Sequence, residues 1–131
     1  MPKGKKPFLS DKKFLQRFGF ETVDTIDKEY ELLALSFDGS KPRFAVNAKK
    51  QRIDDERLII YYGLQCPFIP KTIEQIEAYC QQNNIPLNLV KVDSLEKAKE
   101  VPCIFNNWAV FYKGRFVSVS IFNETFLKKI L

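Results

Sequence analysis

Thiol chemistry is the first possibility that the side chains of this chain offer. The 131 residues include three cysteines, Cys66, Cys80 and Cys103, and no histidine. Without histidine, catalysis would have to use cysteine, tyrosine, carboxylate or lysine side chains. Three cysteines cannot all pair within one chain, and none stands in a Cys-x-x-Cys pair. Because cysteine and histidine together cannot supply four zinc ligands, we expect no metal site in this chain. We also expect no cofactor in this chain, on the grounds given below.

Cys66 stands between a predicted buried strand and a predicted helix, in the segment Gln65-Cys66-Pro67-Phe68-Ile69. We expect its thiol at the cap or first turn of that helix, where free backbone N–H groups and the helix dipole favour an anion. Pro67 suits the first helical position because it has no N–H group. One interpretation is an exposed cysteine with a stabilised thiolate, and the alternative is a small buried residue that packs like alanine.

The elements that would position these residues follow from the hydrophobic pattern. The first part of the chain predicts a helix from the N-cap Ser10 to Gly19 and strands at 20–26 and 30–37. Residues 41–57 are polar and charged, and we interpret them as a linker. The remainder predicts strands at 58–62, 87–92, 109–112 and 115–121, and helices at 70–84, from the cap Ser94 to about Lys99, and at 124–131 after the cap Asn123.

Composition points to an ordinary soluble protein, with 45% apolar and 28% charged residues. The longest apolar stretch, residues 58–70, is too short to cross a bilayer, and no apolar run follows the charged start. We therefore expect a cytoplasmic protein without a membrane partner. The net charge of +5 is modest, and the lysines near the start are typical of a solvated terminus, so we do not expect a nucleic-acid partner.

Residues 58–131 resemble the thioredoxin-like fold, glutaredoxins included. The resemblance rests on the strand-loop-helix layout, the Cys66-Pro67 start of the helix and the Val101-Pro102 step before the hairpin. It implies a cis peptide bond before Pro102, beside the thiol, and a peptide-binding edge at Val101. The candidate binding residues are Gln65, Pro67, Phe68, Val101 and Pro102.

The chain departs from that family at the positions on which the family's thiol chemistry depends. Ile69 stands where the dithiol members have their second cysteine, so a conventional disulfide reductase is not expected. The glutathione-using members have a lysine where this chain has Gly63 and a Gly-Gly turn where it has Lys113-Gly114, which argues against glutathione binding.

A second thiol could still take part. Cys103 follows Pro102 and could approach Cys66 as a resolving thiol, or it could point into the core at the start of its strand. Cys80 lies on the apolar stripe of its predicted helix, and we expect it in the core.

The first part of the chain resembles the C-terminal helix and last two strands of a GNAT-type N-acetyltransferase, in which a helix that ends in Gly-Phe leads into a hairpin. The resemblance rests on residues 14–24 (FLQRFGFETVD) and 30–35 (YELLAL). Joined to the second part, the sequence resembles the C-terminal region of YoaP-type GNAT proteins, in which a thioredoxin-like extension follows the acetyltransferase.

This resemblance implies a relationship to an acyltransferase whose site is incomplete here. None of the five glycines forms the GNAT loop that holds the pyrophosphate of acetyl-CoA. Leu15 stands where many GNAT enzymes have a tyrosine general acid. We therefore expect acetyl-CoA to bind a full-length GNAT protein rather than this chain, and leave open whether the chain is itself part of an enzyme.

These observations predict an α/β fold. It comprises a thioredoxin-like β-α-β-(α)-β-β-α domain at residues 58–131, a linker at 41–57, and a helix and β-hairpin remnant of a GNAT fold at 1–40. The leading hypothesis is the C-terminal region of a GNAT-family N-acetyltransferase-like protein that begins inside a domain, with a binding or positioning role for the thioredoxin-like domain. The alternative is a single-cysteine redox domain that uses Cys66, with Cys103 as resolver. The expected partner is a preceding GNAT domain or a second copy of the chain.

Overall fold

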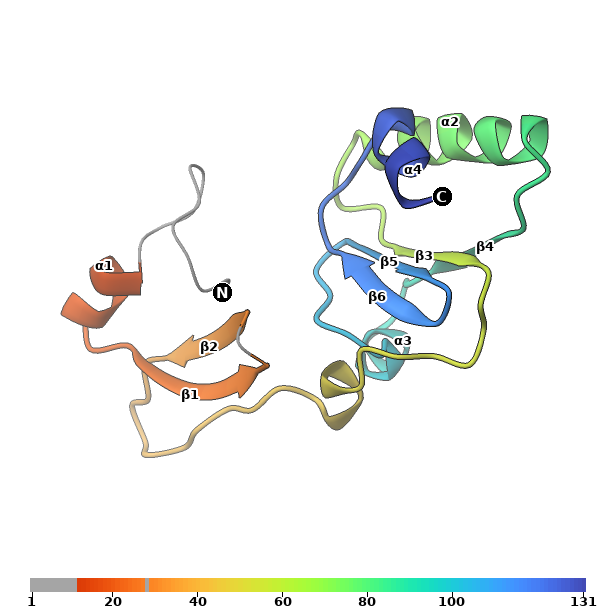
Figure 1. Ribbon diagram of the computed structural model, residues 1–131. Coiled ribbons are helices and arrows are strands. Elements are labelled where there is room, and N and C mark those ends of the chain that lie inside the picture. Colours follow the sequence, from red (N-terminus) through yellow and green to blue (C-terminus); the bar gives the residue numbers. More distant parts are fainter. Residues whose placement is uncertain (1–11, 28) are drawn as a thin grey trace. The chain divides into compact units, whose positions relative to one another are not determined.

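The computed structural model describes residues 12–27 and 29–131 (Figure 1). The predicted N-cap Ser10, the lysine-rich start and Lys28 lie outside the described residues. The chain divides after Ala45 into two compact units, Met1–Ala45 and Val46–Leu131. Each unit is described by itself.

The first unit contains the predicted helix and hairpin in shorter form. Its elements are α1 (Lys12–Arg17), β1 (Glu21–Ile26) and β2 (Tyr30–Ala34), and the two strands pair antiparallel. The backbone of Gly19 has a φ of 89°, and its N–H donates to the carbonyl of Gln16, so the glycine ends the helix as predicted.

The first unit has a small interior. Within its described residues only Ile26 and Glu31 are buried, and Lys12 Nζ lies 3.0 Å from the carboxylate of Glu31. Four large apolar side chains are exposed: Phe14, Phe18, Leu35 and Phe37. A two-stranded hairpin with one short helix buries too little surface to be stable alone, so this apolar surface is available to cover another element.

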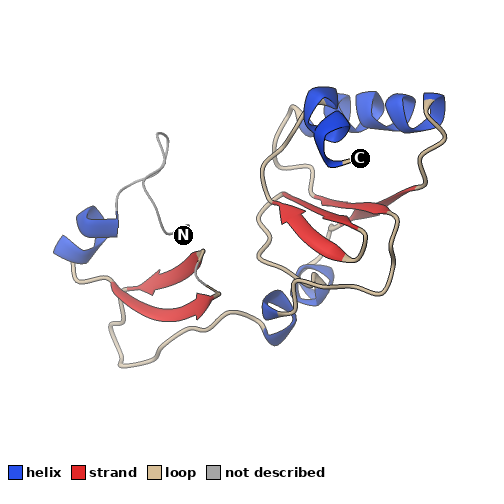
Figure 2. Cartoon of the chain, viewed as in Figure 1, coloured by secondary structure: helices blue, strands red, loops and turns tan. Residues whose placement is uncertain are grey.

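The second unit has a four-stranded mixed sheet with helices on both sides (Figures 1 and 2). Its elements, after the 3-10 helix Val46–Lys49, are β3 (Leu58–Tyr62), α2 (Ile69–Gln82), β4 (Leu87–Lys91), α3 (Leu95–Glu100), β5 (Trp108–Tyr112), β6 (Arg115–Ser118) and α4 (Glu124–Ile130). The strand order is β4-β3-β5-β6. β3 runs parallel to β4 and antiparallel to β5, so the continuous apolar run of β3 belongs to a central strand of a mixed sheet.

Alternation along the strands divides the interior into two cores. On one face, Leu58, Ile60, Trp108 and Val110 pack with α2 and with Leu127 of α4. On the other face, Ile59, Ala109 and Phe111 pack with Val101 and Cys103. α2 and α4 lie on the first side of the sheet and α3 lies on the second (Figure 1).

The second half of the stretch that we predicted as a linker runs along the edge of this sheet. The N–H of Gln51 donates to the carbonyl of Pro102 over 2.8 Å, and its own carbonyl accepts from Phe116. The N–H of Ile53 donates to the carbonyl of Gly114 over 2.9 Å. Residues 46–57 are therefore held by the sheet unit, although they lack an apolar period.

Among the described helices, none combines the length and the apolar character that crossing a membrane requires.

The hairpin turn between β5 and β6 provides a test of how residues 46–57 lie against the sheet. Lys113 and Gly114 have φ values of 52° and 74°, and a Cβ atom on Gly114 would lie 2.7 Å from the carbonyl oxygen of Ile53. We expect Gly114→Ala to lower the free energy of unfolding by about 2 kcal/mol or more, because left-handed backbone alone costs about 1–2 kcal/mol and the contact adds to it. Urea denaturation followed by tryptophan fluorescence measures the change.

The matched control is Asn84→Gly, at another left-handed position of the same unit, with a φ of 53°. It should leave the stability unchanged or raise it by up to about 1 kcal/mol. Equal midpoints for Gly114→Ala and the unmodified chain would contradict the close approach of residue 53 to the turn.

Candidate functional site

The connections that follow β3 and β4 leave the sheet on opposite sides. β3 leads into α2 on one face, and the neighbouring parallel strand β4 leads into α3 on the other (Figure 1). In open α/β sheets, ligands bind in the crevice that such a divergence leaves at the carboxyl ends of the strands. The end of this sheet is therefore the first place to examine for a site.

A groove of about 700 Å³ lies at this position. Three segments line it: the loop after β3, the end of β4 with the start of α3, and the loop before β5. Its lining residues are Gly63, Leu64, Gln65, Lys91, Val92, Asp93, Ser94, Leu95, Ala98, Phe105 and Asn106. Two backbone hydrogen bonds hold the segments together, from Val92 N–H to the carbonyl of Tyr62 and from Gly63 N–H to the carbonyl of Asn107.

The groove combines apolar and polar side chains. Leu64 and Leu95 are 53% and 65% exposed, although both are large and apolar. Phe105 is half-buried, and the carboxamide residues Gln65 and Asn106 are exposed. Such a mixture suits a ligand that has both an apolar group and hydrogen-bonding groups.

Two charged residues line the groove, and one of them is already paired. Asp93 accepts a hydrogen bond of 2.8 Å from Lys97 Nζ, and this bond holds the pKa of the Asp93 carboxyl below its ordinary value. The start of α3 is fixed by Ser94, whose hydroxyl accepts from the N–H of Lys97, as predicted for a cap. Lys91 at the end of β4 is exposed.

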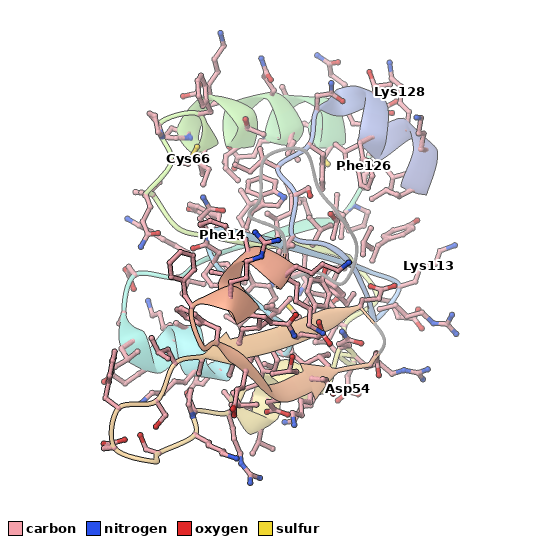
Figure 3. All side chains as sticks on the ribbon, turned by 90° about the vertical axis from the view of Figure 1, so that its left-hand side faces the viewer. Phe14, Asp54, Cys66, Lys113, Phe126 and Lys128 are labelled. Carbon is pink, nitrogen blue, oxygen red and sulfur yellow. The ribbon has the colours of Figure 1, made fainter. Side chains whose placement is uncertain are left out.

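Cys66 lies beside this groove but outside the helix. The predicted position in the first turn is wrong: α2 begins at Ile69 with Phe68 as N-cap, and Pro70, rather than Pro67, stands in its first turn. The carbonyl of Cys66 accepts from the N–H of Ile69 over 3.1 Å, so the cysteine forms a turn before the helix (Figure 3). Its half-buried side chain packs against the core on the α2 face.

The predicted cis peptide bond before Pro102 is wrong. The described residues contain no cis peptide bond, and trans is the lower-energy state of an X-Pro bond by about 0.5–1 kcal/mol. The carbonyl of Pro102 accepts from Gln51, which ties this loop to the segment before β3. Val101 and Pro102 are buried, so neither offers an open edge to a peptide.

The structure does not bring Cys66 and Cys103 together. Cys66 packs against the core on the α2 face, and Cys103 belongs to the core on the opposite face. All three thiols are free. Burial raises the pKa of Cys103 to about 12, and it also raises the pKa of Cys80.

Of the five candidate binding residues, Gln65 lines the groove, whereas Pro67 and Phe68 are exposed in the turn before α2. Sequence reasoning missed the groove residues of the other two segments: Lys91, Asp93, Leu95, Phe105 and Asn106. Lys91 lies at the end of the strand predicted at 87–92, and Asp93 and Leu95 follow that strand directly. This signal could have placed them at the carboxyl edge of the sheet. Within the described ranges no group of three acidic or cysteine residues could hold a metal ion.

Thiol labelling tests the placement of the three cysteines. In the native chain at pH 8 we expect iodoacetamide to alkylate Cys66 at least tenfold faster than Cys80 and Cys103, because both of these are 2% exposed and a thiol with a pKa of about 12 remains protonated at this pH. Peptide mass spectrometry gives the rate at each site, and urea should make all three react.

The Cys66→Ser variant is the control and should lose the fast reaction. Treatment of the native chain with diamide should give no disulfide between Cys66 and Cys103, since they lie on opposite faces of the sheet. Formation of that disulfide before unfolding would overturn the placement.

Two comparisons with known proteins give a match. Residues 86–129, from the end of the α2–β4 connection into α4, match the model of the YoaP-like family. The chain is 31% identical over 131 residues to the "Uncharacterized N-acetyltransferase YoaP" of Bacillus subtilis (strain 168), a match that covers 98% of this chain and 52% of that protein. No solved structure gives a significant match. The chain spans about half the length of this curated relative. It therefore carries a YoaP-like domain and is homologous to the C-terminal half of the Bacillus protein.

Proposed function

We propose that the chain is the C-terminal region of a GNAT-related N-acetyltransferase-like protein. In this proposal, residues 12–45 extend the sheet of an acetyltransferase domain, and the second unit is a thioredoxin-like domain with a binding or positioning role. The observation that carries the proposal is the match of nearly the whole chain to half of a protein named as an N-acetyltransferase.

The exposed apolar surface of the first unit supports this role. Phe14 of α1 and Phe18, directly after the helix, have ring centroids 5.1 Å apart and are 52% and 63% exposed. Phe37 after β2 is 92% exposed. Full burial of each such side chain would contribute about 1.5–3 kcal/mol to an interface. Packing against a preceding acetyltransferase domain would bury these side chains. The free edge of the hairpin could also pair with a strand of that domain.

The second unit supports a thioredoxin-like assignment through its order of elements alone. Its strands and helices follow as β3-α2-β4-α3-β5-β6-α4, the order that the resemblance implies. The buried Val101-Pro102 step argues against that family's peptide edge at this position. A binding role would therefore use the groove at the ends of β3 and β4.

Acetyl transfer itself would belong to the part of the protein outside this chain. A pyrophosphate cradle needs a glycine-rich loop that leads into a helix N-terminus. Gly19 ends α1, Gly39 follows the hairpin, Gly63 ends β3, and Gly114 forms the β5–β6 turn, so none of these glycines opens a helix. We expect this chain alone not to bind acetyl-CoA.

A thiol role for Cys66 is the second candidate. Cys66 is the one cysteine of the three that is not buried, and this observation favours a single-cysteine site open to mixed-disulfide formation. The burial of Cys103 on the other face of the sheet leaves it without a role as resolver.

Complementation tests the leading proposal. The tagged chain is co-expressed with the half of the Bacillus protein that it does not span, and we expect the two to co-purify and to be stabilised together by acetyl-CoA. The double substitution Phe14→Ser and Phe18→Ser should lower the co-purified yield at least fivefold, because it removes apolar surface from the interface without disturbing a buried residue.

Leu95→Ser is the matched control, since Leu95 is 65% exposed and lies in the groove of the second unit. It should leave co-purification unchanged. The proposal would be contradicted by an equal loss in both variants, or by a clear rise in the melting temperature of this chain alone with acetyl-CoA.

A further inference from the structure

The groove at the ends of β3 and β4 presents apolar side chains from each of the three segments that line it. Leu64 comes from the loop after β3 and Leu95 from the start of α3, and both are more than half exposed. Phe105, from the loop before β5, is a third apolar lining residue and packs partly into the core below. An apolar side chain that enters the groove can therefore contact three separate segments of the fold.

The polar lining offers the groups that a peptide backbone needs. Gln65 and Asn106 each carry a carboxamide, which has an NH₂ donor and a carbonyl acceptor. In the described part of the chain, neither side chain makes a hydrogen bond to another residue. A peptide unit, with one N–H and one C=O, complements such a carboxamide, whereas a hydrocarbon chain would leave it without a partner.

The charge of the groove selects the sign of a ligand. Asp93 pairs with Lys97 over 2.8 Å and also feels the charge of Lys91, the other charged lining residue, so two lysines act on one carboxylate and a net positive charge remains. The positive charge of Lys91 therefore favours an acidic group beside the apolar one. A nucleotide is a poorer match, because the groove has no glycine-rich loop to hold phosphates.

We infer that this groove binds an extended peptide segment in which an apolar side chain adjoins an acidic residue. The apolar side chain lies between Leu64, Leu95 and Phe105, the carboxamides bond the peptide backbone, and Lys91 faces the acidic group. The inference rests on the proposed binding role of the second unit and names the class of partner.

The test is an NMR titration of the full ¹⁵N-labelled chain with the blocked peptide acetyl-Ala-Leu-Glu-Ala-amide. We expect saturable shifts of the backbone amides of Gln65, Leu95 and Asn106 with a millimolar dissociation constant. Two control peptides replace leucine by serine or glutamate by lysine, and each should bind at least fivefold more weakly.

Two substitutions separate recognition from folding. Leu95→Ser should weaken binding of the leucine-glutamate peptide at least threefold, and Lys91→Glu should reverse the preference so that the leucine-lysine peptide binds more tightly. A reversal of preference cannot result from unfolding. Lys129→Glu, an equal change of charge at an exposed site on α4, is the matched control and should keep the original preference.

The inference would be overturned by shifts that map outside the groove, by the absence of any shift, or by an unchanged charge preference in Lys91→Glu. The double substitution Phe14→Ser and Phe18→Ser should bind the peptide normally. The titration tests the groove and co-purification tests the surface of the first unit. A negative result in one experiment therefore does not contradict the proposal that the other experiment tests.

Discussion

The alternation of side chains along two central strands is the constraint on which the second unit depends. Leu58 and Ile60 face one side of β3 and Ile59 the other, and β5 repeats the pattern with Val110 and Phe111. Both faces of the sheet must therefore be covered, and the chain does so by sending α2 to one side and α3 to the other. The divergence of those two connections opens the groove, so the same constraint that builds the cores also creates the candidate site.

Sequence patterns predicted the elements wherever side chains carry the signal. β3 begins and ends as predicted because its five residues form an uninterrupted apolar run, and Ser94 and Asn123 cap their helices as predicted because each accepts from a backbone N–H three residues later. The start of α2 was predicted to within one residue, but Cys66 and Pro67 were wrongly placed at its cap and first turn, because Pro70 is the proline that occupies that turn. The attachment of residues 46–57 escaped prediction because backbone hydrogen bonds and the isolated apolar contacts of Ala48 and Ile53 hold them to the unit, without an apolar period in the sequence.

The candidate site was harder to predict because its parts lie far apart in the sequence. The Cys-Pro motif drew attention to residues 65–68, and of these Gln65 lines the groove. The other lining segments, around Lys91 and Asn106, contain no recognisable motif and come together only through the pairing of β3 with both of its neighbours. The interpretation of Cys103 as a partner of Cys66 failed because two loops can lie close together at a sheet edge while their thiols point to opposite faces of the sheet.

The exposed apolar surface of the first unit and the groove of the second unit differ in chemistry, and this difference suits them to different kinds of binding. The exposed apolar surface of the first unit includes Phe14, Phe18 and Phe37. The described residues of this unit include only two buried side chains, so covering that surface would stabilise it. Apolar interfaces of this kind are typical of permanent association. The groove of the second unit joins leucines to carboxamides and a lysine, and it belongs to a unit that already has two complete cores. Folding of that unit does not require an occupant in the groove, so the peptide inferred there would be free to exchange, whereas in the proposed association the surface of the first unit would stay covered.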